Sequence, residues 1–171
     1  MGLQLIILNE ALRYFKYFEK MDKKMDKKIY ILNGPNLNLL GHREPEIYGK
    51  TTLDEINNKC HAISKEGGYT TVCLQSNSEG QLVDWIQEAI HEASAIIINP
   101  GAYGHTSVAL LDALNAFKGQ VAEVHISNIH QREKFRHHSY ISSRADFVIL
   151  GLGAYGYEIA LKSIINAFLK T

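Results

Sequence analysis

The fold of this chain is decided by the stretch Ile29-Tyr30-Ile31-Leu32-Asn33-Gly34-Pro35-Asn36, in which four large, mostly apolar residues run into a polar turn. Four comparable runs follow it, at residues 70–74, 95–98, 121–126 and 147–150. Each run is short and mostly apolar, as is typical of strands that are buried on both faces of a parallel sheet. The sequence between the runs carries apolar residues at helical spacing. The alternation therefore predicts an α/β protein, with helices covering both faces of the sheet.

The helices are predicted from their first residues. Thr52 is followed three residues later by Glu55, a spacing typical of a capping box that begins a helix. Further helices are expected to begin near Glu79, near Thr106 and near Tyr155. Together with the five strands, they predict a flavodoxin-like three-layer sandwich with a five-stranded parallel sheet.

The composition fits one domain that acts on a small molecule. The 171 residues are 46% hydrophobic, enough for one full core, and 18 basic residues balance 18 acidic ones. Zero formal net charge gives no electrostatic footprint for nucleic acid or an anionic membrane. Cys60 and Cys73 match no disulfide framework and no metal motif, and no apolar run reaches the length of a membrane span. A cytoplasmic protein is therefore expected.

Residues 1–27 are predicted to be an N-terminal extension, and residues 28–171 a single flavodoxin-like domain. Residues 21–28 repeat Met-Asp-Lys-Lys in tandem, so Met25 is a second candidate for the translation start.

Polar residues gather after the predicted strands. They are Asn36, Arg43 and Tyr48 after the first strand, and residues 76–79, 99–107 and 125–139 after the next three. Because ligands of such sheets bind beyond the carboxyl ends of the strands, these four loops are expected to converge on one site.

Within the first of these loops, Arg43 and Tyr48 suggest a tyrosine that acts as a base. A free tyrosine has a pKa near ~10, so it is a poor base at neutral pH unless a positive charge stabilises the phenolate. Arginine supplies such a charge because it stays protonated. The alternative, in which Tyr48 packs on its own loop and Arg43 is solvated, fits this segment equally well.

Several longer motifs are found between Lys28 and the end of the chain. They are residues 33–37, 43–49, 75–79, 99–103, 105–107, 123–133 and 135–140. In this order and spacing they resemble the type II 3-dehydroquinate dehydratases, flavodoxin-like enzymes that convert 3-dehydroquinate to 3-dehydroshikimate and water. The resemblance implies anti elimination through an enolate in the shikimate pathway of aromatic amino acid biosynthesis, without a cofactor or metal. A role in quinate breakdown stays open as an alternative.

The resemblance also implies a role for each matched residue. Tyr48 is the base as its phenolate, Arg43 stabilises that phenolate and the transition state, and His125 donates a proton to the leaving hydroxyl. Asn36 is expected near the enolate oxygen, and Glu123 is expected to orient a histidine. The residues implied to bind substrate are Asn99, His105, Asp112, Ile126, Ser127 and Arg136, with Ile126 and Ser127 acting largely through backbone N–H groups. The implied assembly is a homododecamer of four trimers, in which a neighbour's surface completes each site.

Three positions carry separate expectations. Asp112 is expected to be partly buried because two leucines precede it. Ser78 and Gly104 depart from the commonest residues of the family, which are histidine and a threonine or serine. Gly104 is expected to loosen the loop that positions His105.

The segment Gly151-Leu152-Gly153-Ala154-Tyr155-Gly156 matches the dinucleotide-binding fingerprint. Only fifteen residues follow Gly156, too few for a second strand and a ribose-binding acid, so a tight turn with close helix packing is favoured. The alternative class is a flavodoxin-like module that binds a nucleotide or flavin. Such a module needs small hydroxyl and glycine residues at a helix start, which the loop with Asn36, Arg43 and Tyr48 lacks.

Overall fold

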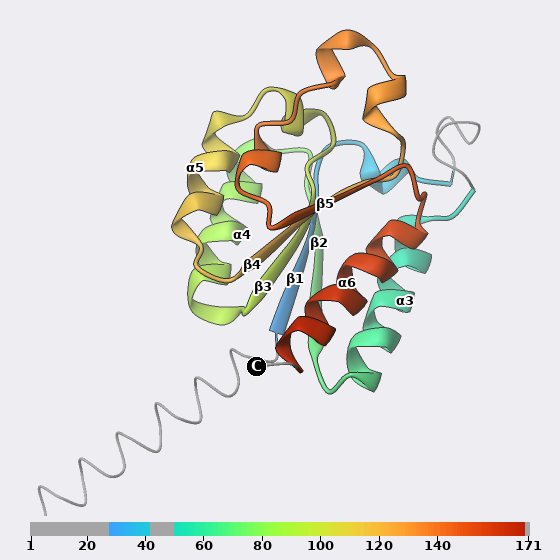
Figure 1. Cartoon of the computed structure of the whole chain (residues 1–171), viewed down its shortest axis with the longest axis vertical. Helices are drawn as coiled ribbons and strands as arrows, with labels where there is room; N and C mark the ends of the chain where they lie inside the picture. Colours follow the sequence, from blue (N-terminus) through green and yellow to red (C-terminus); the bar gives the residue numbers. More distant parts are fainter. Residues whose placement is uncertain (1–27, 42–49, 170–171) are drawn as a thin grey trace, which may run out of the picture.

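The computed structural model describes residues 28–41 and 50–169, and its strands form one parallel sheet in the order β2-β1-β3-β4-β5 (Figure 1). The strands are β1 (Lys28–Asn33), β2 (Thr70–Gln75), β3 (Ala95–Asn99), β4 (Gln120–His125) and β5 (Phe147–Leu150). The α-helices are α3 (Leu53–Glu66), α4 (Glu79–Glu92), α5 (Val108–Ala116) and α6 (Tyr155–Phe168). The strand order and the flanking helices confirm the predicted flavodoxin-like sandwich.

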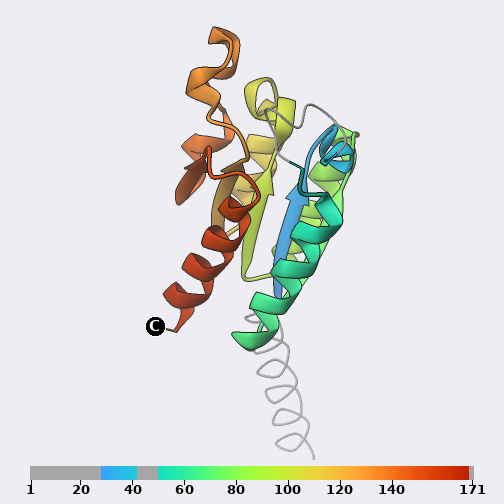
Figure 2. The same cartoon turned by 90° about the vertical axis from the view of Figure 1, so that its right-hand side faces the viewer.

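Alternate side chains of the central strands face opposite layers of helix. On β1, Ile29 and Ile31 pack with residues of α3 and α6, while Tyr30 and Leu32 pack with residues of α4 and α5. The same division is seen in the cartoon, where α3 and α6 cover the face of the sheet that is turned toward the viewer in Figure 2. Both faces of β1 are buried, which is why its sequence is apolar at consecutive positions.

The two edge strands are more exposed than predicted. Every residue of β3 is buried, whereas β2 and β5 contain no fully buried residue. The expectation that all five strands are buried on both faces is therefore wrong for β2 and β5. The order of strands in the sheet decides which of them lie at an edge, and a local apolar run does not encode that order.

The capping box predicted for α3 is confirmed. The Thr52 hydroxyl accepts a hydrogen bond from the N–H of Glu55 at 3.2 Å, and the Glu55 carboxylate accepts one from the N–H of Thr52 at 2.8 Å. Helices α4 and α6 also begin where predicted, at Glu79 and Tyr155. None of the helices in the described part of the chain is both long enough and apolar enough to cross a bilayer.

Two predicted boundaries are displaced. β4 spans residues 120–125 rather than 121–126. α5 begins at Val108 rather than near Thr106, because the hydroxyl of Ser107 accepts a hydrogen bond from the N–H of Leu110 at 2.9 Å and caps the helix. The residues before this cap form the 3-10 helix η2 (Gly101–His105).

The loops that follow the strands converge at one edge of the sheet, as predicted. The N–H of Gly34 donates to the carbonyl of Asn99 at 2.8 Å, and a Cβ at position 34 would lie only 2.2 Å from the carbonyl oxygen of Pro100. Only glycine lets the loops after β1 and β3 approach so closely. The N–H of Asn36 donates to Oδ1 of Asn77 at 2.9 Å, which joins the loop after β2 to the loops after β1 and β3.

Candidate active site

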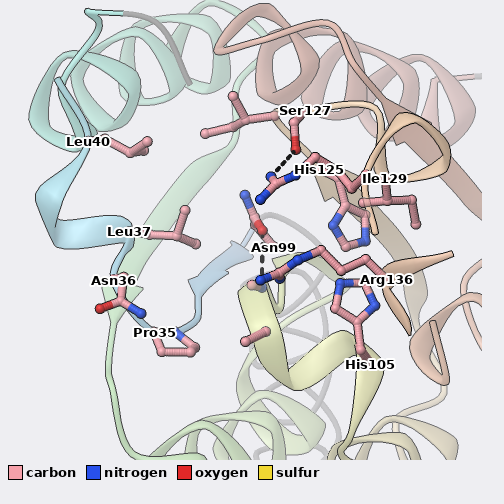
Figure 3. Close-up of a pocket in the computed structure, with 14 residues that line it drawn as sticks. Pro35, Asn36, Leu37, Leu40, Asn99, His105, His125, Ser127, Ile129 and Arg136 are labelled. Carbon is pink, nitrogen blue, oxygen red and sulfur yellow. Dashed lines mark hydrogen bonds between the residues drawn. The ribbon is translucent and has the colours of Figure 1, made fainter. Parts of the chain in front are cut away.

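A pocket lies at the carboxyl ends of β1, β3 and β4, where the strand order reverses between β1 and β3 (Figure 3). Open α/β sheets bind their ligands at this position. The predicted site residues that line the pocket are Asn36, Asn99, His105, His125, Ile126, Ser127 and Arg136. Apolar parts of its wall come from Pro35, Leu37, Leu40 and Ile129. The structure therefore brings together most of the residues that the sequence singled out.

Asn36 borders the pocket in a left-handed backbone conformation, with φ of 67°. It is the only residue other than glycine with a positive φ in the described part of the chain. Asparagine adopts this conformation more readily than most residues, and such outliers concentrate at functional sites. The hydrogen bond from its N–H to Asn77 holds the conformation in place.

His125 lies at the end of β4 and is paired with a buried carboxylate. Its Nε2 is 2.7 Å from Oε1 of Glu123, whose side chain is 0% exposed. Because a carboxylate only accepts hydrogen bonds, Nε2 carries the proton and Nδ1 is left for a ligand. This contact supports the expectation that Glu123 orients a histidine.

Two serines complete the surroundings of Glu123. The hydroxyl of Ser139 donates to Oε1 of Glu123, and that of Ser142 donates to Oε2. Burial opposes the charge of Glu123, yet the hydrogen bond and charge of His125 together with the two hydroxyls hold the pKa of its carboxyl below the ordinary value. Glu123 is therefore a buried anion at neutral pH. Sequence reasoning assigned no role to either serine.

His105 lies beside His125, with the two rings stacked at 18° and their centroids 6.1 Å apart. Its Nδ1 is 2.8 Å from the carbonyl oxygen of His138, so Nδ1 donates and Nε2 is an acceptor in the neutral ring. Burial, with the charges of His125 and Arg136, lowers the pKa of His105, although the bond to His138 acts in the opposite direction. His105 is therefore neutral at pH 7 and suited to accept a hydrogen bond from a substrate hydroxyl.

Asn99 is fixed by a buried polar chain that the sequence did not reveal. Its Nδ2 donates to the hydroxyl of Tyr157 at 2.8 Å, and that hydroxyl donates to Oδ1 of Asn33 at 2.6 Å. Its Oδ1 accepts from the N–H of Gly101 at 3.2 Å, the contact drawn beside Asn99 in Figure 3. Burial raises the pKa of Tyr157 well above that of a free tyrosine, so this residue is a hydrogen-bonding support and not a base. Tyr157 lies in the first turn of the amphipathic helix α6, where only its contact across the core marks it out.

Two arginines give the pocket positive charge. Arg136 was predicted from the family resemblance, whereas Arg132 was not assigned a role in the site. Nη1 of Arg132 donates to the hydroxyl of Ser127 at 3.4 Å, and both arginines approach the same carboxylate of Glu133. Two guanidinium groups that share one carboxylate leave the pocket suited to an anionic ligand.

Asp112 is not part of this pocket. It lies on α5 with an exposed side chain, so the expectation of partial burial is wrong. Leu110 is buried because it faces the sheet, and the helical rotation to position 112 turns the carboxylate to the opposite side. Arg43 and Tyr48 lie outside the described residues, as does the predicted extension over residues 1–27.

The glycine motif after β5 forms a turn in which the glycine N–H groups already donate to the protein's own carbonyls. The N–H of Gly151 donates to the carbonyl of His125 at 3.1 Å, and that of Gly153 donates to the carbonyl of Ile126 at 3.0 Å. A Cβ at Gly156 would lie 3.3 Å from side chains of β4 and β5, which makes it a close packing position. These contacts agree with the structural interpretation of the motif. In residues 28–41 and 50–169, no group of three or more metal-ligating side chains is arranged to hold a metal ion.

The two departures from the family pattern have local explanations. The hydroxyl of Ser78 caps α4 by accepting from the N–H of Gln81 at 3.5 Å. Gly104 is buried, its carbonyl accepts from the N–H of Tyr140 at 2.8 Å, and a Cβ there would lie 3.1 Å from the hydroxyl of Ser139. The expected loosening of the loop stays a prediction, while the structure shows Gly104 packed in place with its carbonyl hydrogen-bonded.

The sequence and the fold match known proteins over most of the chain. The family model described as Dehydroquinase class II matches residues 27–165. The 3-dehydroquinate dehydratase 2 of Agrobacterium fabrum is 59% identical over 141 residues, which are 82% of this chain and 96% of that protein. The 3-dehydroquinate dehydratase of Cereibacter sphaeroides is 59% identical over 140 residues, 82% of this chain and 95% of that protein.

Solved structures agree with these matches. The crystal structure of type II dehydroquinase from Propionibacterium acnes has a TM-score of 0.79 and 43% sequence identity, and the match covers 83% of this chain and 98% of that one. Matches of this extent set aside the alternative of a nucleotide or flavin module. The chain therefore belongs to the class II dehydroquinase family, the type II 3-dehydroquinate dehydratases.

Proposed function

We propose that this chain, as a type II 3-dehydroquinate dehydratase, removes water from 3-dehydroquinate by anti elimination through an enolate, in the shikimate pathway of aromatic amino acid biosynthesis. The observation that carries the mechanism is the buried pair of His125 and Glu123 at the wall of the pocket. A base first takes the proton next to the substrate ketone, and the electron pair left behind forms the enolate. As the enolate collapses, the carbon–oxygen bond to the leaving hydroxyl breaks and that oxygen takes a proton from an acid, so water departs.

His125 is the acid of the second step. When its ring is protonated, Nε2–H donates to the Glu123 carboxylate and Nδ1–H points to the leaving hydroxyl. The buried Glu123 carboxylate accepts the Nε2–H and holds the ring in this orientation. After transfer, the neutral ring keeps its proton on Nε2, so the same hydrogen bond persists through the reaction.

Tyr48 is the base and Arg43 the charge that stabilises its phenolate. Support comes from the family motif and from the residues that flank 42–49. Leu40 lines the pocket, and a Cβ at Gly41 would lie 3.0 Å from the carbonyl of Lys50. The two flanks of this segment thus lie close together, and the first of them borders the pocket. An arginine beside a developing enolate in a site that excludes water stabilises the transition state by several kcal/mol.

The remaining pocket residues bind the substrate. The substrate carboxylate is held by backbone N–H groups of Ile126 and Ser127, next to the positive charge of the two arginines. Neutral His105 accepts from a substrate hydroxyl through Nε2, and Asn99 is held rigidly by its buried partners. Asn36 lies near the enolate oxygen.

Asp112 binds substrate in the site of a neighbouring subunit. Its exposure on α5, outside the pocket of its own chain, is incompatible with a contact to substrate in that pocket. A neighbour's Asp112 completes each site if the chain forms trimers, and four such trimers form the proposed dodecamer.

The mechanism is tested by following the near-ultraviolet absorbance of the conjugated product when purified protein is mixed with 3-dehydroquinate. Tyr48→Phe removes the only proton-accepting oxygen of that side chain, so kcat is expected to fall by at least about a hundredfold, the usual contribution of a general base. The matched control is Tyr155→Phe, an exposed tyrosine on α6 whose removal should leave kcat unchanged.

Two results would contradict the proposal. Full turnover in Tyr48→Phe would assign the base to another residue. Absence of turnover in the folded wild-type protein would refute the dehydratase activity itself.

A further inference from the structure

The carboxylate that holds His125 is itself held at both oxygens. Oε1 of Glu123 accepts from Nε2 of His125 and from the hydroxyl of Ser139, and Oε2 accepts from the hydroxyl of Ser142. Glu123 is 0% exposed and Ser139 is 6% exposed. The two serines follow Glu123 by 16 and 19 residues along the chain, so their contacts with it are made only in the folded chain.

We propose that Ser139 and Ser142 are positioning residues for the dehydration, because their two hydroxyls fix the Glu123 carboxylate in the one orientation that keeps the proton of His125 on Nε2 and leaves Nδ1 to the substrate. This inference rests on the proposed function of His125 as the acid. Neither serine touches the pocket surface, so both act through Glu123.

The chemistry of a buried carboxylate makes both donors necessary. An ionised carboxylate needs several donors to replace the water it loses on burial, and His125 supplies one. Without the hydroxyl of Ser142, Oε2 would be a buried acceptor with no replacement for water, and the side chain could rotate or take up a proton. Either change would remove the acceptor that fixes the His125 tautomer.

The charges around the pair make this support more important. His105 from η2 interacts electrostatically with both members of the pair and with Arg136 of the 3-10 helix η4 (Lys134–Arg136). The anionic form of Glu123 is the acceptor of the His125 Nε2–H at 2.7 Å. The serines keep Glu123 in that form, as the lowered pKa of its carboxyl indicates.

The serines are in turn held by the loop that carries His105. The N–H of Tyr140 donates to the carbonyl of Gly104 at 2.8 Å, and Ser142 lies in the 3-10 helix η5 (Ile141–Ser143) that follows. A Cβ at Gly104 would approach the hydroxyl of Ser139 to 3.1 Å. The absence of a side chain at position 104 thus leaves room for Ser139 to reach Glu123.

The first test compares Ser142→Ala in two backgrounds. In the wild-type background kcat should fall on the order of tenfold with little change in KM, because a hydrogen bond to a charged group is lost. In a Glu123→Ala background no carboxylate is left for Ser142 to hold, so the same change should alter kcat by less than about twofold. Ser142→Thr, which restores a hydroxyl, should recover most of the loss.

The matched control is Ser143→Ala. Ser143 lies in the same turn, but its hydroxyl donates to the carbonyl of Tyr140 at 2.8 Å and not to Glu123. Its kcat should stay within about twofold of wild type, as for most surface substitutions. Thermal unfolding of each variant separates loss of fold from loss of positioning.

A second readout does not depend on turnover. Imidazole ¹⁵N shifts of histidine-labelled protein, with the His125 signal assigned by its loss in His125→Asn, should show the neutral ring protonated on Nε2 in the wild type. The double variant Ser139→Ala/Ser142→Ala should show a mixture of tautomers. An unchanged tautomer, or an equal fall of kcat in both backgrounds, would overturn the proposal. Missing turnover in the wild type with the expected tautomer change would refute the dehydratase mechanism but not the positioning by the serines.

Discussion

At position 34 the backbone of one loop meets the backbone of another. A Cβ there would lie 2.2 Å from the carbonyl oxygen of Pro100 and 2.6 Å from its carbon, and neither atom can move as a side chain would. Gly34→Ala is therefore expected to lower the free energy of unfolding by more than about 2 kcal/mol and to impair turnover, because the loops after β1 and β3 must separate. The control is Gly80→Ala on α4, where the nearest atom would be 4.0 Å from an added Cβ. Alanine has the higher helix propensity, so this variant should have a free energy of unfolding as much as about 1 kcal/mol above that of the wild type. Chemical denaturation measures both, and wild-type stability in Gly34→Ala would contradict the prediction.

At the scale of a helix, the start of α3 depends on Thr52, the residue that caps the first turn. Thr52→Ala removes the hydroxyl that caps Glu55, so the protein is expected to lose about 1 kcal/mol of stability. Ser78→Ala at α4 offers a comparison within the same chain. Its hydroxyl makes a longer contact of 3.5 Å, so the loss should be smaller. Equal losses for the two helices in urea titrations would contradict this account.

The same capping box predicts a dependence on pH. The N–H and hydroxyl of Thr52, with a smaller contribution from the charge of Lys59, hold the pKa of Glu55 below its ordinary value of 4.5. A carboxyl whose pKa is lowered by folding stabilises the fold above its ordinary pKa and loses that contribution as the pH falls through its folded pKa. The difference in stability between wild type and Thr52→Ala should therefore shrink as the pH falls below 4.5. A difference that is constant from neutral pH to the acid limit of folding would argue against an ionised cap.

At the scale of the whole molecule, the exposed position of Asp112 predicts that two impaired variants can restore each other's activity. Asp112→Asn should weaken substrate binding and His125→Asn should abolish turnover, while Asp84→Asn, an exposed acid on α4, serves as control. After dissociation and joint reassembly of equal amounts, about a quarter of the sites should combine an intact His125 with a neighbour's intact Asp112. Recovered activity measures this fraction, and light scattering reports the assembly. Mixed assemblies without recovered activity would contradict a role for Asp112 in a neighbouring site.

The sequence by itself determined the strands, the layers and the edge at which the site forms. Apolar runs such as 29–32 encode burial on both faces, and Thr52 with Glu55 encodes a helix start, because these signals involve residues close in the chain. Convergence of the loops follows from the parallel order alone. His125 could be singled out only through the family motif, since a histidine at a strand end has no local feature of its own.

Only the tertiary structure decided how the site is supported. The hydroxyl of Tyr157 reaches Asn33 across 124 residues of sequence, and Ser142 reaches Glu123 across 19. Arg144 donates to the carbonyls of Leu114, Phe117 and Gly119 and so ties the end of α5 and the turn after it to the segment that precedes β5. The exposure of the edge strands and of Asp112 was likewise set by which elements lie side by side. These contacts depend on the packing of elements that are distant in sequence. A local pattern of residues does not encode which distant elements pack together.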